Sequence, residues 1–244
     1  MTTNQTSGHS GLVWAILGGA VLIAGLVAII VSSLLTQPTP SPSGTASESP
    51  SSAAPTMGAA DRDVVDASVG ERGWVPEPIT TGREVYIRAA LEAASTFDTQ
   101  LSTREEWLDY LDTWFTPDTR YTAEADQEAA MQASLVEFHQ GVVLPQEEWD
   151  SLANEDGRVV AATSGDVAYV PVTDDASGDM SIGTSDVTLL FTRSDGGGGE
   201  TAYEEQVRVS VQVLCGPGSV PTRDSAQQAG DCKVVRYFTE PLEP

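Results

Sequence analysis

The chain has 244 residues and carries 36 Asp and Glu against 12 Lys and Arg, which gives a formal net charge of −24. Because binding to phosphate needs clustered cations that release counterions, this balance excludes direct recognition of nucleic acid. Acidity also favours solubility in general, and we favour that explanation over a specific cationic partner.

An uncharged, mostly apolar run occupies residues 12–35, and no charged side chain precedes Glu48. As a helix the run spans about 36 Å, enough to cross a hydrocarbon core of about 30 Å. The sequence predicts a transmembrane anchor at 12–35 after a short cytoplasmic N-terminus, residues 1–11. A cleaved signal peptide is the alternative, disfavoured by the length of the run and the lack of a basic start. Lys and Arg are absent near both ends of the run, so charge gives no orientation.

Residues 36–80 are predicted to form a disordered stalk. Pro, Ser, Ala and Thr dominate up to residue 60, a composition that buries little apolar surface. Residues 61–80 are transitional, charged and carry Trp74, and they either pack on the following domain or stay loose. The remainder, residues 81–244, suits one domain.

Three helices are expected first in this domain. Apolar spacing predicts a helix within residues 82–100. Either Ser102 with Glu105 or Thr103 with Glu106 forms a capping box that opens the second helix. A third helix is predicted at residues 123–138. The apolar positions of the second and third helices are Trp107, Leu108, Leu111, Trp114, Phe115, Met131, Leu135 and Phe138.

The pattern then alternates with period two, which is typical of strands. Strand-like segments cover residues 158–162, 167–172, 186–193, 204–214 and 234–238, and a Gly-rich hairpin connection occupies residues 194–200. The predicted fold is α+β, with about three helices packed on one face of a curved, four-stranded antiparallel sheet.

Cys215 and Cys232 flank an irregular loop. With no second cysteine pair and no nearby histidine, zinc lacks ligands, and a disulfide is favoured over two free buried cysteines. A disulfide persists in an oxidising compartment, so the domain is predicted to lie outside a bacterial plasma membrane that the chain crosses once.

The order of elements resembles a known family. The Trp-rich segment EEWLDYLDTWF at 105–115 is followed by a meander that ends in VRVSVQVL and CKVVRYF, which looks like the nuclear transport factor 2-like, or cystatin-like, cone fold. With one span and a stalk, the chain is similar to the bitopic assembly proteins of type IV secretion and conjugation systems. The resemblance implies an envelope scaffold that self-associates and contacts other channel components. It transfers no functional residue.

Catalysis has to be argued from the residues themselves, because one fold hosts many activities. His139 is the only histidine of the predicted domain, and we expect it at a helix end, stabilised by the dipole, rather than in catalysis. Asp109 and Asp112 are expected to face solvent. The acidic segments 154–157 and 173–179 lack the ligand spacing of a calcium loop. The sequence therefore predicts no catalytic residue, no cofactor, no metal site and no enzyme.

Two functions remain. The first is a membrane-anchored scaffold that contacts envelope proteins or itself, with Trp107 and Trp114 in the core and Trp149 and His139 as candidates for an interaction surface. The alternative is a module that holds a small ligand inside the cone. A cone filled by Trp favours the scaffold, whereas an open pocket with convergent polar groups favours the ligand.

Overall fold

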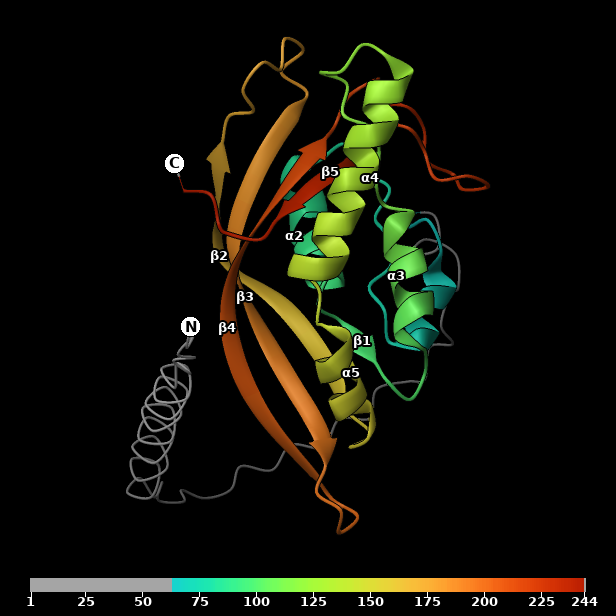
Figure 1. Ribbon diagram of the computed structural model, residues 1–244, viewed down its shortest axis with the longest axis vertical. Coiled ribbons are helices and arrows are strands. Elements are labelled where there is room, and N and C mark those ends of the chain that lie inside the picture. Colours follow the sequence, from blue (N-terminus) through green and yellow to red (C-terminus); the bar gives the residue numbers. More distant parts are fainter. Residues whose placement is uncertain (1–62, 244) are drawn as a thin grey trace, which may run out of the picture. The chain divides into compact units, whose positions relative to one another are not determined.

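The computed structural model of the protein describes residues 63–243, which are organised around a curved antiparallel sheet (Figure 1). The predicted membrane span at 12–35 and most of the predicted stalk lie outside the described residues. Among residues 63–243, no helix has both the length and the apolar character needed to cross a bilayer.

Five strands follow one another in the sheet in the order of the sequence, and every neighbouring pair is antiparallel. The alternating pattern is the reason, since Val207, Val209, Val211 and Val213 of one strand all direct their side chains to the core. The strands are β1 (Phe97–Asp98), β2 (Arg158–Val170), β3 (Met180–Ser194), β4 (Glu200–Leu214) and β5 (Lys233–Phe238).

Two details of the sheet differ from the prediction of four strands. The segments predicted at 158–162 and 167–172 belong to one strand, β2, whose register with β3 shifts between Ser164 and Ala168. Gly165 in this irregular stretch has φ +67°, a conformation that glycine adopts without strain. The fifth strand is β1, which is too short to produce a pattern and exists through its pairing with the start of β2.

Five helices are described where three were predicted: the 3-10 helix η2 (Ala67–Arg72) and four α-helices. Helix α3 begins with the second of the two predicted capping boxes, in which Thr103 and Glu106 bond each other's backbone N–H. The short α5 was missed because it spans barely two turns. The α-helices are α2 (Arg83–Ala93), α3 (Arg104–Asp112), α4 (Glu124–Gly141) and α5 (Gln146–Ala153).

The helices cover the concave face of the sheet (Figure 1), and aromatic side chains fill the space between. Trp107 and Trp114 are almost completely buried, as predicted. Trp114 lies beyond the end of α3, where an extended segment pairs with β5: Val234 N–H donates to Trp114 O at 3.0 Å. Trp149 of α5 stacks on Phe97 and Trp107 and is 4% exposed. It therefore belongs to the core and supplies no interaction surface, which corrects the alternative left open above.

The domain starts well before residue 81. Val65 N–H donates to Glu77 O, and Ile79 N–H donates to Asp63 O, both at 2.8 Å, so this segment folds back on itself. The buried Trp74 donates its indole N–H to Ser102 Oγ at 3.0 Å. Residues 63–80 consequently pack on the domain, and the stalk prediction for residues 36–62 stays a prediction.

Candidate functional site

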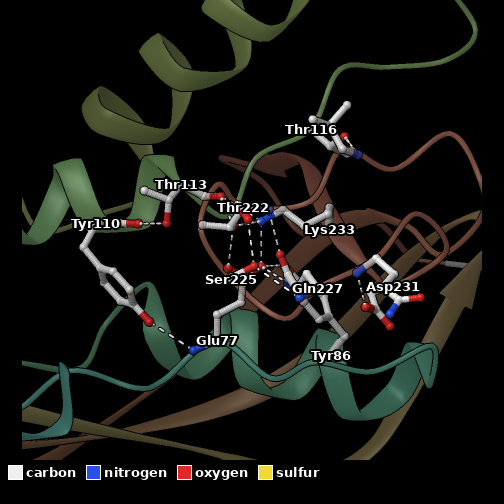
Figure 2. A network of polar contacts seen from close by, with 12 residues as sticks. Glu77, Tyr86, Tyr110, Thr113, Thr116, Thr222, Ser225, Gln227, Asp231 and Lys233 are labelled. Atoms are coloured by element: carbon white, nitrogen blue, oxygen red, sulfur yellow. Dashed lines mark hydrogen bonds and ion pairs between the residues drawn. The ribbon is translucent and has the colours of Figure 1, made fainter. Parts of the chain in front are cut away.

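A buried ion pair lies where the N-terminal segment meets the last strand (Figure 2). Glu77 comes from the segment 63–80, and Lys233, the only lysine of the chain, opens β5. Their side chains are 0% and 1% exposed, and Lys233 Nζ lies 2.8 Å from Glu77 Oε1. Two charges so far from water persist only when their remaining hydrogen-bonding capacity is used.

The ammonium group of Lys233 uses all of its donors. Besides Glu77, it donates to Thr113 O and to Thr222 Oγ1, both at 2.7 Å. Burial lowers the pKa of Lys233, and the charge of Glu77 opposes that shift. An amine enclosed in this way has no free donor to offer a substrate.

The carboxylate of Glu77 is equally well satisfied. Tyr86 OH donates to Oε1 at 2.6 Å, Gln227 Nε2 donates to Oε1 at 3.1 Å, and Thr222 OH approaches Oε2 at 3.2 Å. Burial, followed by the charge of Glu77, raises the pKa of the Tyr86 hydroxyl well above its usual value. Tyr86 therefore stays protonated and remains a donor. We call Glu77, Tyr86, Thr113, Thr222, Gln227 and Lys233 the polar clamp.

The polar clamp joins segments that are distant in sequence: the N-terminal segment, α2, the residues after α3, the cysteine loop and β5. Tyr110 of α3 adds a further tie, because its hydroxyl donates to Val75 O at 2.7 Å and accepts from Glu77 N–H at 3.0 Å. These contacts hold residues 63–80 against the rest of the domain. Neither Glu77 nor Lys233 lines the cavities described below.

A disulfide joins Cys215 and Cys232, the two cysteines that the sequence paired. It closes the loop that carries Thr222 and Gln227 of the polar clamp. Cys232 N–H also donates to Thr80 O at 2.7 Å, so the loop contacts the N-terminal segment directly. The cross-link thus holds two of the partners of Glu77 in place.

An open cavity of about 430 Å³ lies between the concave face of the sheet and the connection from α4 to α5. Most of its wall is apolar. Its single titratable lining residue is Arg208, which bonds Asp186 at 2.9 Å and Glu243 at 2.6 Å; these bonds raise its pKa. The apolar wall includes Leu91, Phe97, Val142, Leu144, Val159, Leu189, Phe191, Val207, Val209 and Phe238.

A second cavity, of about 290 Å³, adjoins the first through Leu144 and Phe191. Its wall is formed by α5 and the far part of the β3–β4 hairpin, where Tyr203 stacks on Phe191 with ring centroids 4.8 Å apart. Glu148 and Glu205 line it as well. The space between the helices and the sheet is therefore partly filled by aromatic side chains and partly open.

His139 lies in the last turn of α4 and pairs with Asp112, with Nε2 2.7 Å from Oδ1. Burial raises the pKa of Asp112, while the bond to His139 opposes the shift. Asp112 is therefore half-buried and paired, which corrects the expectation that it faces solvent. His139 is half-exposed and does not line either cavity.

The sequence indicated the cysteine pair but not the ion pair that it supports. Glu77 lies between two prolines in a segment expected to be loose, so nothing in its neighbourhood predicted burial. Lys233 carried one signal, since a lone lysine among eleven arginines heads a strand whose other residues are largely apolar.

Comparison with protein-family models and with curated proteins finds no match. Among solved structures, the chain is similar to an IcmL-like type IV secretion system protein from Legionella pneumophila, with 11% identity and a TM-score of 0.37, over 64% of this chain and 88% of that one. It is also similar to CagV, a VirB8 homologue of the type IV secretion system of Helicobacter pylori, with 13% identity and a TM-score of 0.36, over 64% and 92%. Both solved structures are of type IV secretion proteins, the class that the order of sequence elements resembles.

Proposed function

We propose that the protein is a membrane-anchored scaffold. Residues 12–35 cross the plasma membrane, residues 63–243 lie outside it, and the domain works by contact with other proteins of a secretion or conjugation apparatus or with itself. We choose a type IV secretion or conjugation apparatus because the order of the predicted elements resembles the assembly proteins of these systems. The disulfide supports the location, because such bonds persist in oxidising compartments.

The polar clamp is the observation that carries the proposal. It fastens residues 63–80, through which the chain enters the domain, to β5 and to the cysteine loop by a buried, fully bonded contact. A scaffold that works by contact needs a rigid domain, and the polar clamp fixes the first residues of the domain to its last strand. The chemistry of the first cavity supports the same view, since Arg208 is its only titratable lining residue and its side chain is already paired twice.

The test is crosslinking in the native host, followed by isolation of the protein from solubilised membranes. The proposal expects co-isolation of other envelope proteins or of a second copy. Recovery of a lone monomer would contradict it. Labelling of thiols in intact cells, before and after reduction, checks the location, because Cys215 and Cys232 should react only after reduction and without permeabilising the cells.

The cavity of about 430 Å³ favours one second candidate, a module that binds a small apolar molecule. Mass spectrometry of the intact chain under native conditions distinguishes the two. In the Leu189→Trp variant the new side chain partly fills the cavity. A small molecule that the wild type retains and this variant loses would support the ligand-binding function. A scaffold expects no retained molecule and unchanged co-isolation by that variant.

A further inference from the structure

Strand β4 has a partner on one side only along most of its length. Its residues pair with β3 from Glu200 to Leu214 without a register shift. On the other side, β5 pairs with β4 only from Ser210 to Leu214. Within residues 63–243, the stretch 200–209 therefore ends the sheet as an open edge, in the half of the β3–β4 hairpin that extends away from β5 (Figure 1).

This edge lacks three of the features that usually protect one, proline, lysine and a bulge, and its charged residues are mostly acidic. In an antiparallel strand every second residue directs both N–H and C=O to the same side, so about five residues present unpaired backbone groups over roughly 33 Å. Proteins commonly blunt such edges with proline, lysine or a bulge. Residues 200–209 contain neither proline nor lysine, and their pairing with β3 is regular.

The two cavities lie along this edge on the concave side. Val207 and Val209 line the first cavity, and Tyr203 and Glu205 line the second. A strand added beside β4 would direct alternate side chains to this side, toward the apolar walls. Main-chain bonds would then supply affinity and the cavities would select the side chains, which is how β-augmentation works.

The charge around the edge defines the partner. Each nearby arginine already has a carboxylate: Arg158 bonds Glu200, Arg193 bonds Glu155, and Arg208 bonds Asp186 and Glu243. By contrast, Glu148, Glu204 and Glu205 have no cationic partner among the described residues. The edge therefore offers unmatched negative charge, and a ligand that carries Lys or Arg would complement it.

We infer that residues 200–209, with the two adjoining cavities, bind an extended segment of a partner protein in which apolar residues alternate with Lys or Arg. A second copy of this chain fits poorly, because the edge-to-edge pairing that overlaps all of residues 200–209 would bring Glu204 and Glu205 of both copies together. The inference deepens the proposed function by naming a docking surface and the chemistry of its partner. It rests on that function only in requiring that the scaffold has a partner.

The probe is a labelled decapeptide of alternating Val and Lys, titrated against the full chain in nanodiscs of zwitterionic lipid, with binding to empty nanodiscs subtracted. We expect saturable binding that weakens as salt is raised, and no binding of the corresponding Val and Glu peptide. Two further peptides are N-methylated at alternate residues, in frames offset by one residue. Only the frame that blocks the N–H groups facing β4 should lose binding, by more than about tenfold, since several main-chain bonds disappear together.

Neighbouring glutamates provide a matched pair of variants. Glu205 lines the second cavity, and Glu204 lies on the opposite face of the same strand. Glu204→Lys should weaken binding of the probe by about tenfold and Glu205→Lys by less than about threefold, because the lysines of a strand whose valines face the cavities lie on the same face as Glu204.

Three results would overturn the inference: no binding by the unmodified probe, equal binding by both N-methylated frames and the parent peptide, or equal weakening by the two variants. If one of these results is obtained while envelope proteins still co-isolate with the chain, the β4 docking surface is wrong and the scaffold function stands. Peptide binding without co-isolated partners would instead count against the scaffold.

Discussion

Glu77 and Lys233 show what a buried charge requires at the scale of single residues. Each contributes an ion to the interior, and each is bonded by neutral donors or acceptors that leave no capacity unused. Removing one partner from such a pair strands the other, whereas removing both charges often costs little. We therefore expect a single substitution in this pair to lower the free energy of unfolding much more than the double substitution does.

Lys233→Met should lower the free energy of unfolding by about 3–5 kcal/mol, because Glu77 is left buried without its cation. The double variant Glu77→Gln with Lys233→Met should recover at least half of that loss, since the remaining groups are neutral. Urea unfolding followed by Trp fluorescence measures both.

An exposed pair serves as the control for this comparison. Glu200→Gln removes the ion pair with Arg158, in which the two side chains are 57% and 37% exposed, and should change stability by less than about 1 kcal/mol. If Lys233→Met costs no more than Glu200→Gln, the polar clamp does not fasten the domain.

The residue scale is also where sequence reasoning reached least far. Trp107 and Trp114 could be assigned to the core because their positions follow a helical stripe or its extension. Trp149 could not, since it follows charged residues and is buried only by stacking on Phe97 from another element. The polar clamp depends entirely on contacts between distant segments, which no local pattern encodes.

At the scale of elements, length and pattern decided what could be predicted. The β3–β4 hairpin and the capped start of α3 carry strong local signals, an alternating run around a Gly-rich turn and a capping box. β1 has two residues and α5 has eight, so neither repeats its period often enough to be recognised. The irregularity in β2 interrupts the alternating pattern of the sequence, and for this reason one strand was predicted as two.

The loop between Cys215 and Cys232 has little regular structure. We expect the disulfide that closes it to contribute substantially to the stability of the domain. Substituting both cysteines, Cys215→Ser with Cys232→Ser, should lower the free energy of unfolding by about 3 kcal/mol for a loop of this length. Unfolding in urea with and without reductant measures the effect. The wild type with reductant should match the double variant, and the variant should not respond to reductant; a variant as stable as the oxidised wild type would show that the bond is dispensable.

At the scale of the whole molecule, the boundary of the domain is the clearest difference from the sequence prediction. Composition placed it at residue 81, where periodic sequence begins, whereas Trp74 and Glu77 are buried within the fold. Local composition failed because a short irregular segment can be held by a few distant contacts.

A fragment of residues 63–244 should fold with native stability, while a fragment of residues 81–244 should be severely destabilised. The shorter fragment lacks Trp74 and Glu77. It therefore exposes the surface on which Trp74 packs and leaves Lys233 buried without its carboxylate. Near-ultraviolet circular dichroism and limited proteolysis compare the two. Equal protection in both fragments would mean that residues 63–80 are not part of the folded unit.

The separation between Glu77 and its partners has a consequence for how the chain is made. Gln227 and Lys233 follow Glu77 by 150 and 156 residues, so the part of the domain synthesised first is among the last to be fixed. Until the final strand has been synthesised and the loop before it has closed, Glu77 lacks Gln227 and Lys233, and the segment 63–80 is held only by its contacts with residues 86–110. An incomplete or unoxidised chain should therefore be cleaved by proteases first in the segment 63–80, which leads to the predicted anchor.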